Sequence, residues 1–276
     1  MSIVLGIDVG ISTTKIVGLI EGKVISPIRI TATDPVTSLY GAFGKFLNDN
    51  SFTLSDIEHV MLTGVGSSLI NGDIYGLPTD KTDEFIADGL GASYESQLKK
   101  MIVVSMGTGT TLVKYDHGEI THLGGLGMGG GTLAGLSRML LGTDDMEHVA
   151  RLAKKGNISN IDLQIGDICK QEIPGLPAFA TASLLGKAQQ TTSKEDIALG
   201  LMFSVLQTIG SAAILASINS DIKDFVMIGN LTQLPECKRV FSLMEQIYGV
   251  KYHIPKHAHF STAIGAALSY KQIVKL

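Results

Sequence analysis

Leu5-Gly6-Ile7-Asp8-Val9-Gly10-Ile11-Ser12-Thr13-Thr14-Lys15-Ile16-Val17 is the stretch that decides the fold of this 276-residue chain. Apolar residues predict a buried strand over residues 2–9 and a second over residues 16–20, joined by a tight polar hairpin. Asp8 is the exception in this pattern, because a carboxylate in a buried strand is costly unless it is paired or holds a cation. The sequence therefore predicts a functional acid at the end of the first strand.

The hairpin after Asp8 offers groups that suit a nucleotide polyphosphate with Mg²⁺. Gly10 allows close backbone approach, Ser12, Thr13 and Thr14 carry hydroxyls, and Lys15 adds one positive charge. Taken alone, the stretch is equally consistent with an ordinary turn next to an incidental acid.

The composition limits the classes of function. With 276 residues and 45% apolar residues, the chain suits one large domain or two medium ones. A net charge of −4 argues against binding to nucleic acid or to an anionic membrane. Residues 197–218 are free of charge, yet their polar content predicts a buried helix of a soluble protein. No signal peptide is recognisable, and Cys169 and Cys237 have no metal-binding spacing, so we expect a cytoplasmic protein.

A second strand–turn–strand unit repeats the first. Residues 101–105 predict a buried strand, Gly107-Thr108-Gly109-Thr110-Thr111 a turn, and residues 112–115 the returning strand, followed by another strand over 119–123. This repeat predicts two lobes, residues 1–98 and 99–276, each bringing a phosphate-facing hairpin to a shared cleft.

Residues 124–131 contain six glycines in eight positions and lead into a predicted helix over residues 132–141. Such a helix start can approach and attract an anion. It has neither the Rossmann nor the Walker spacing. The remaining expected elements are a strand over 23–33, a helix from Pro35, a strand over 57–63, helices over 83–98 and 146–155, a strand over 225–229 and a last helix from about residue 260.

The first hairpin, the turn over residues 107–111 and the glycine-rich stretch follow one another in the order of the two phosphate motifs and the glycine loop of the actin and hexokinase superfamily, which the chain therefore resembles. Within it, the chain is similar to the type II pantothenate kinases over essentially its whole length. The residues that carry the resemblance are Gly6-Ile7-Asp8-Val9-Gly10 with Lys15, Leu62-Thr63-Gly64, Asp83-Glu84-Phe85, Gly107-Thr108-Gly109-Thr110, the glycine-rich stretch 124–131, Ile228-Gly229 and Phe260-Ser261-Thr262-Ala263-Ile264-Gly265-Ala266. The resemblance implies an α/β, two-lobed actin-like ATPase (ribonuclease H-like) fold with ATP in the cleft between the lobes.

The resemblance also implies roles for individual residues. Glu84 takes the position of the general base that accepts the proton of the pantothenate hydroxyl. Without the resemblance, it would be interpreted as an acid at a helix start that the helix dipole stabilises. Asp8 would hold Mg²⁺ through water, and Lys15 would face the transferred phosphate. The implied ATP-binding residues are Asp8, Val9, Gly10, Ile11, Ser12, Thr13, Thr14, Lys15, Thr108, Thr110, Gly130, Gly131, Thr132, Leu133, Ala134, Met146 and Asn230.

His122 departs from the family pattern, in which an Arg usually contacts the pantothenate carboxylate or a nearby phosphate. Histidine is smaller and not permanently charged, so the departure concerns substrate identity or affinity. A surface histidine without a role is the competing interpretation.

Three other functions remain open. The chain also resembles the ATPase activators of 2-hydroxyacyl-CoA dehydratases, but Cys169 and Cys237 do not occupy the positions of their iron–sulfur ligands. A kinase for a related sugar or small metabolite usually has an Asp base, commonly in an Asn-Asp context that no matching position here supplies. A non-catalytic regulator is the third. The resemblance further implies a homodimer joined in part by the helix over residues 197–218.

Overall fold

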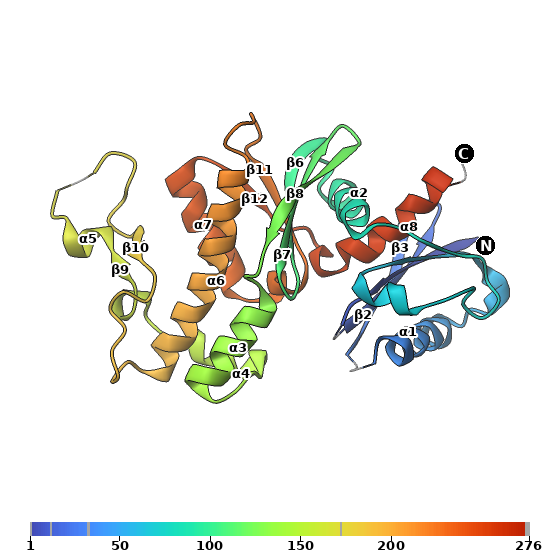
Figure 1. Cartoon of the computed structure of the whole chain (residues 1–276), viewed down its shortest axis with the longest axis horizontal. Helices are drawn as coiled ribbons and strands as arrows, with labels where there is room; N and C mark the ends of the chain where they lie inside the picture. The colour runs from blue at the N-terminus through green and yellow to red at the C-terminus, as the bar shows by residue number, and fades with distance from the viewer. Residues whose placement is uncertain (1, 12, 32–33, 172, 274–276) are drawn as a thin grey trace. The chain divides into compact units, whose positions relative to one another are not determined.

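Two five-stranded mixed sheets organise the chain in the computed structural model, which describes residues 2–11, 13–31, 34–171 and 173–273 (Figure 1). The first sheet has the order β3-β2-β1-β4-β5. Its strands are β1 (Ile3–Val9), β2 (Thr13–Ile20), β3 (Lys23–Thr31), β4 (Ile57–Thr63) and β5 (Thr79–Lys81). The central strand β1 pairs antiparallel with β2 and parallel with β4.

The second sheet has the order β12-β11-β6-β7-β8, and a separate two-stranded sheet pairs β10 with β9. The strands are β6 (Lys100–Met106), β7 (Thr110–Asp116), β8 (Glu119–Leu126), β9 (Leu163–Gln164), β10 (Thr181–Ser183), β11 (Asp224–Ile228) and β12 (Lys251–His253).

Eight α-helices and five short 3-10 helices connect the strands in the described part of the chain. The α-helices are α1 (Pro35–Asn50), α2 (Glu84–Ser96), α3 (Gly130–Leu141), α4 (Met146–Ala153), α5 (Ile165–Ile168), α6 (Lys194–Ala216), α7 (Glu236–Tyr248) and α8 (Ser261–Ile273). The 3-10 helices are Leu54–Asp56, Val65–Leu69, Ile158–Asn160, Asn230–Gln233 and Ala258–Phe260.

The chain forms two compact units made of several segments each. The first unit comprises Met1–Val103, Val113–His122 and Pro255–Leu276, and the second comprises Val104–Leu112 and Leu123–Ile254. The predicted lobe boundary between residues 98 and 99 stays a prediction.

The first sheet is covered on both faces, which follows from the alternation of its side chains. Ile3, Leu5 and Ile7 of β1 pack with Phe43 of α1 in one apolar cluster. Val4 faces the other way and packs with residues of α8. Burial on both faces is what the near-continuous apolar run around Asp8 predicts.

Glycines let α8 approach its neighbours very closely. A Cβ atom at Gly6 would lie 2.0 Å from the Ala263 carbonyl oxygen, and one at Gly265 would lie 1.7 Å from the Ala87 carbonyl oxygen. No other residue fits there without a shift, because such distances are far below van der Waals contact. The small-residue face of the last helix thus fixes α8 against β1 and α2.

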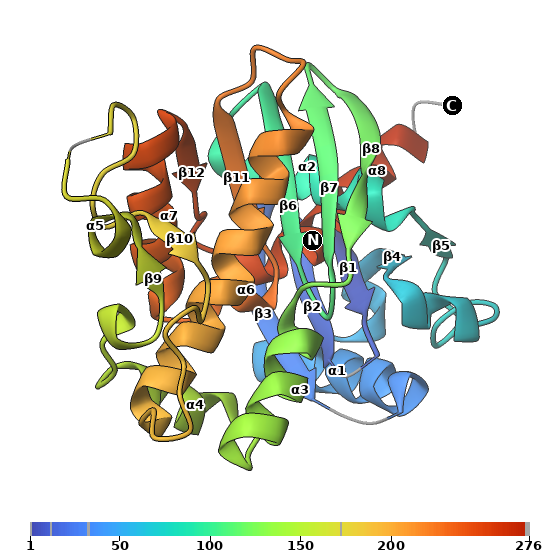
Figure 2. The ribbon, with the colours of Figure 1, turned by 60° about the vertical axis from the view of Figure 1, so that its left-hand side comes forward.

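The second unit is built around α6, which packs against α3, α4 and α7 (Figure 2). The helix is long and apolar enough to span a membrane by composition, but 61% of its most apolar window is buried inside the protein. Burial within the unit explains its composition, as the sequence predicts.

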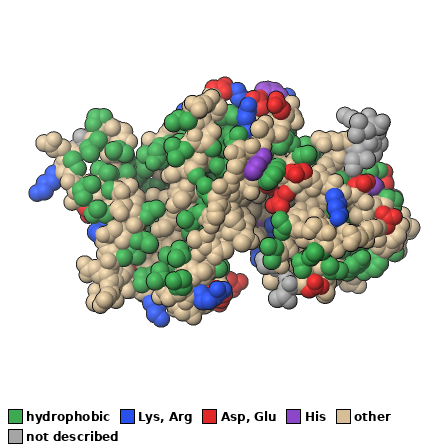
Figure 3. Space-filling view, viewed as in Figure 1, with side chains coloured by type: hydrophobic (Ala, Val, Ile, Leu, Met, Phe, Trp, Pro, Cys, Tyr) green, Lys and Arg blue, Asp and Glu red, His purple; other side chains and the backbone are tan. Residues whose placement is uncertain are grey.

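Charged side chains of both signs are scattered in small groups over the face shown in Figure 3.

Most predicted elements are confirmed to within a few residues, with three corrections. The expected hairpin over residues 10–15 is wrong in extent, because β2 begins at Thr13 and continues the antiparallel pairing with β1. The glycine-rich stretch is not all loop, since β8 extends to Leu126 and α3 begins at Gly130. Helices α5 and α7 and strands β5, β9, β10 and β12 had no counterpart in the prediction.

Candidate active site

Asp8 and Lys15 form a buried ion pair in the first unit. They are directly opposite each other on the antiparallel strands β1 and β2, and Lys15 Nζ lies 3.2 Å from Asp8 Oδ2. Both residues are less than a tenth exposed. The lysine offsets the cost of burying the carboxylate, which explains how the sheet tolerates an acid at this position.

Thr63 and Gly64 complete the surroundings of Asp8, and the sequence pointed to them only through the family motif. Thr63 is opposite Asp8 on the parallel strand β4 and fully buried, and its hydroxyl has no hydrogen-bond partner in the part of the chain that the structure describes. Gly64 has a φ of +83°, and a Cβ atom there would lie 2.6 Å from Asp8 Oδ1. A buried polar atom without a partner is costly, so it indicates a place for a ligand or its water.

The groups around Asp8 fit a hydrated Mg²⁺ ion. Magnesium prefers oxygen ligands and keeps several waters, so one carboxylate with a nearby hydroxyl is a suitable donor set. The hydrogen bond from Lys15 uses Oδ2, and the missing side chain of Gly64 leaves space next to Oδ1.

Glu84 is the first residue of α2, directly after the N-cap Asp83, whose side chain accepts a hydrogen bond from Phe85 N. The pKa of Glu84 is raised to about 7: burial is the largest cause, the negative charge of Asp8 adds to it, and Lys15 opposes the shift. The predicted base is therefore close enough to the Asp8–Lys15 pair to respond to both charges. A carboxyl group with this pKa can exchange a proton near neutral pH.

His122 lies beside the same helix start. Its ring stacks on that of Phe85, with ring centroids 3.9 Å apart and 4° between the planes. His122 itself is exposed. The first unit therefore holds an imidazole in a defined orientation next to the residue that follows Glu84.

The other predicted residues of the first hairpin differ in accessibility. Thr13 and Thr14 are buried, and Thr14 Oγ1 lies 2.5 Å from Ser38 Oγ of α1, so this hydroxyl already has a partner. Val9 is fully buried, whereas Ile11 is exposed. The Gly10 amide donates to the Thr13 carbonyl oxygen. Ser12 lies outside the described residues, and its predicted role stays a prediction.

In the second unit, the turn Gly107–Thr108–Gly109 packs on the start of α3. The amides of Gly130 and Gly131 donate to the carbonyl oxygens of Gly107 and Thr108, each at 2.9 Å. The expectation that first-turn amides of this helix are available to an anion is therefore wrong for these two, because the turn already accepts their hydrogen bonds. These hydrogen bonds hold the turn and the helix start together, and the predicted contact of Gly130 and Gly131 with a nucleotide stays a prediction.

The remaining polar groups of this turn hold the glycine-rich stretch in place. Thr110 is buried and its hydroxyl donates to the Met128 carbonyl oxygen at 2.8 Å, whereas Thr108 is exposed. Thr132 donates to the Gly127 carbonyl oxygen and accepts from the Gly129 amide. Gly129 has no room for a Cβ atom, which would lie 2.5 Å from the Thr108 carbonyl oxygen.

Asn230 follows β11 beside the same turn. Gly229 has a φ of +92°, and a Cβ atom there would lie 2.5 Å from the Met106 carbonyl oxygen at the end of β6. The Asn230 Oδ1 atom is buried and has no hydrogen-bond partner among the described residues, the same signal as at Thr63. Leu231 is the side chain nearest to Gly130, so this segment and the α3 start are neighbours.

Leu133, Ala134 and Met146 complete the predicted nucleotide-binding set. Leu133 is fully buried and Ala134 partly buried on α3, while Met146 is the first residue of α4 and partly buried. Their contact with a nucleotide stays a prediction.

Comparisons with known proteins agree with this architecture. The family model Fumble matches residues 68–269. A type II pantothenate kinase from Staphylococcus epidermidis is 28% identical, and the alignment covers 95% of this chain and 98% of the relative. One from Bacillus cereus is 26% identical, and the alignment covers 82% of this chain and 83% of the relative.

Solved structures resemble the chain over almost its whole length. The activator of the 2-hydroxyisocaproyl-CoA dehydratase from Clostridium difficile with bound ADPNP has a TM-score of 0.72 at 17% identity, covering 99% of this chain and 98% of the activator. A ROK family glucokinase from Streptomyces griseus in complex with glucose and AMPPNP has a TM-score of 0.61 at 12% identity, covering 98% of this chain and 99% of the glucokinase. These likenesses confirm the predicted α/β actin-like ATPase fold class.

Proposed function

We propose that this chain, which belongs to the Fumble family, is an ATP-dependent kinase that phosphorylates the hydroxyl group of pantothenate, an early step of coenzyme A biosynthesis. The relatives at 25–29% identity that are named type II pantothenate kinases support this substrate. The resemblance of the motifs around Asp8, Glu84 and Thr108 supports the reaction type.

The observation that carries the proposal is the raised pKa of Glu84, to about 7, beside the Asp8–Lys15 pair. A hydroxyl group that attacks a phosphate must lose its proton, and a carboxylate accepts it best when its pKa is close to the working pH. An acid that served only to cap α2 would gain nothing from burial, because burial disfavours its charged form.

ATP is the proposed phosphate donor, supported by the ATP analogues named in the solved neighbours. Asp8 and the partnerless hydroxyl of Thr63 would hold a hydrated Mg²⁺ ion, which neutralises phosphate charge when bound. Lys15 supplies a fixed positive charge next to Asp8 in the first unit. In the second unit, the exposed Thr108 and the buried amide oxygen of Asn230 are the proposed nucleotide contacts.

Activation of a dehydratase is the rival function, because solved activators share the fold. It needs thiolate ligands for an iron–sulfur cluster. Cys237 is fully buried, so its thiol cannot reach a cluster at a subunit surface, which leaves only Cys169 accessible. The cysteines therefore favour the kinase.

We further propose a cytosolic homodimer. Leu215 near the end of α6 and Ile218 just after it are about two thirds exposed, and an apolar surface of this kind suits a subunit contact. Light scattering of the purified protein at micromolar concentration tests this, and a monomer at all concentrations rules it out.

The experiment that tests the function measures ATP consumption with pantothenate, pantetheine or no acceptor and identifies the product by mass spectrometry. We expect phosphopantothenate from the wild type. In Glu84→Gln, turnover should fall by at least a hundredfold while ATP still binds. The matched control is Asp83→Asn, which keeps the helix cap and should stay within about threefold of the wild type.

Two outcomes contradict the proposal. Near-normal turnover of Glu84→Gln removes Glu84 from the mechanism. ATP binding without phosphorylation of either acceptor leaves the fold and overturns the substrate.

A further inference from the structure

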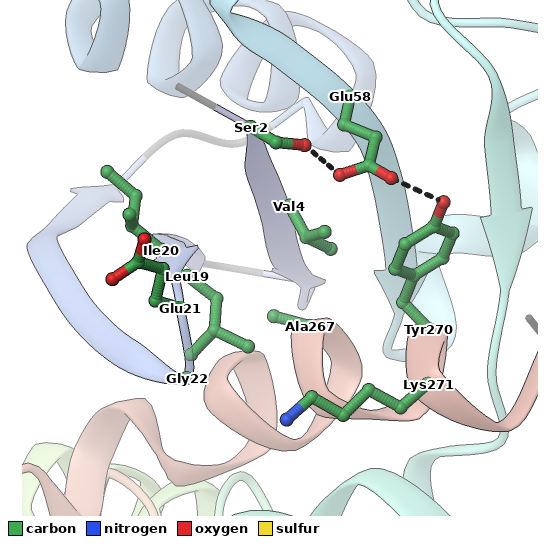
Figure 4. Close-up of a pocket in the computed structure, with 10 residues that line it drawn as sticks. All are labelled: Ser2, Val4, Leu19, Ile20, Glu21, Gly22, Glu58, Ala267, Tyr270 and Lys271. Carbon is green, nitrogen blue, oxygen red and sulfur yellow. Dashed lines mark hydrogen bonds between the residues drawn. The ribbon is translucent and has the colours of Figure 1, made fainter.

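A pocket of about 500 Å³ lies in the first unit beside the last turns of α8 (Figure 4). Val4 of β1, Leu19 of β2 and Ala267 of α8 provide an apolar wall, and all three belong to one buried cluster. The volume and the apolar lining are typical of small-molecule sites, which bind by burying apolar surface and orient the ligand with a few polar groups.

Glu58 at the start of β4 is the polar group that faces this wall. Figure 4 shows Ser2 and Tyr270 donating hydrogen bonds to its two carboxylate oxygens, and the Tyr270 bond is 2.9 Å long. Each oxygen can accept a second hydrogen bond, because a carboxylate offers about four acceptor positions. Glu58 thus keeps acceptor capacity toward a ligand.

The position of Tyr270 is fixed before any ligand arrives. Its ring stacks on that of His59, with centroids 4.5 Å apart, and His59 Nε2 lies 2.9 Å from Asp80 Oδ2. A polar group held by its neighbours in this way loses little entropy on binding, so the wall is preorganised.

The charge of the pocket is negative. Its charged side chains are Glu21, Glu58 and Lys271, two carboxylates against one ammonium group. The hydrogen bonds from Ser2 and Tyr270 lower the pKa of Glu58, so this carboxylate stays ionised at neutral pH. Both donors are neutral hydroxyls, so neither of them neutralises its charge, which favours a positively charged ligand group.

The pocket is separate from the proposed kinase site. Asp8 lies four residues beyond Val4 on the same strand, which corresponds to about 13 Å at the rise of a β-strand. A ligand here therefore leaves the Asp8–Lys15 pair free.

We propose that this pocket binds an amphipathic amine. The aliphatic body of the ligand lies against Val4, Leu19 and Ala267, and its ammonium group donates to the Glu58 carboxylate. Aliphatic burial supplies most of the binding free energy, because Glu58 is exposed and its ion pair is screened by solvent.

The test uses the full chain without an N-terminal tag, because Ser2 lines the pocket. Calorimetric titrations compare octylamine, octanol and octanoate below their micelle concentrations. We expect one saturable octylamine site that is at least fivefold tighter than octanoate. Glu58→Gln should remove this preference, and Leu19→Phe, which fills the pocket, should weaken octylamine binding at least fivefold.

Two controls match these variants outside the pocket. Glu119→Gln removes an exposed carboxylate from β8, and Val65→Phe enlarges an exposed apolar side chain; both should bind octylamine as the wild type does. Equal or tighter binding of octanoate, no saturable binding, or an unchanged amine preference in Glu58→Gln each overturns the proposal. The amine preference of Glu58→Gln can be measured even where Leu19→Phe fails to fold, because Glu58 is on the surface.

Discussion

The rings of His122 and Phe85 are parallel and in contact, with 3.9 Å between their centroids. Phe85 follows the proposed base Glu84 on α2, whereas His122 lies on β8. The stack holds a side chain without a permanent charge where the family resemblance places an arginine. In the proposed kinase, the acceptor would therefore meet a flat aromatic surface at this point instead of a guanidinium group.

We predict that His122→Arg lowers the KM for pantothenate about five- to tenfold and leaves that for pantetheine within about twofold. Arginine can stack on the Phe85 ring as histidine does, and it adds a charge that pairs with a carboxylate, which pantetheine lacks. Initial rates with both acceptors measure this. An equal change for the two acceptors would show that His122 does not contact the carboxylate end of the substrate.

The raised pKa of Glu84 predicts the pH dependence of the reaction. The base acts in its deprotonated form, so kcat/KM should rise about tenfold per pH unit below pH 7 and level off above it. Asp83 contributes to the raised pKa, so Asp83→Asn should move the midpoint to lower pH. ATP also titrates in this range, but its titration is the same for both proteins. An identical midpoint in the variant would therefore assign the profile to another group.

Thr63→Val tests the oxygen site next to Asp8. The hydroxyl is buried without a partner, so replacing it by a methyl group of similar shape should leave the melting temperature unchanged or slightly higher. If the hydroxyl orders a water of the Mg²⁺ ion, the Mg²⁺ concentration for half-maximal activity should rise at least fivefold.

Ser38→Ala is the matched control for Thr63→Val, because it removes another buried hydroxyl in the same unit. Ser38 Oγ has partners in Thr14 and Pro35, so its loss should cost about 1 kcal/mol of stability without changing the Mg²⁺ requirement. A Thr63→Val protein that melts lower with an unchanged Mg²⁺ requirement would show a purely structural hydroxyl.

The strand before Asp8 was predictable because its local pattern is strong. Seven consecutive buried residues with one carboxylate need no knowledge of distant parts of the chain. The extent of β8 was not predictable in this way. Gly124 and Gly125 are poor strand formers, yet they continue β8, since tertiary pairing overrides propensity.

The partners within the candidate site depend on contacts far apart in sequence. Thr63 meets Asp8 only because β4 runs parallel to β1, and His122 meets Phe85 only when β8 lies beside α2. Periodicity along the chain reports neither contact. Glu84 was identified through the family motif, and its raised pKa depends on burial, which a sequence pattern does not report.

Gly265→Ala tests how strictly α8 is fixed against α2. The added Cβ atom would lie 1.7 Å from the Ala87 carbonyl oxygen, so one helix must move, and we expect a loss of about 3 kcal/mol or more of unfolding free energy. Gly44→Ala is the control at an exposed position of α1, where a Cβ atom meets nothing within 4 Å. It should stabilise the protein by about 0.5–1 kcal/mol, since alanine is the better helix former. Urea unfolding measures both changes, and equal stability of the two variants would show that the helices can separate at little cost.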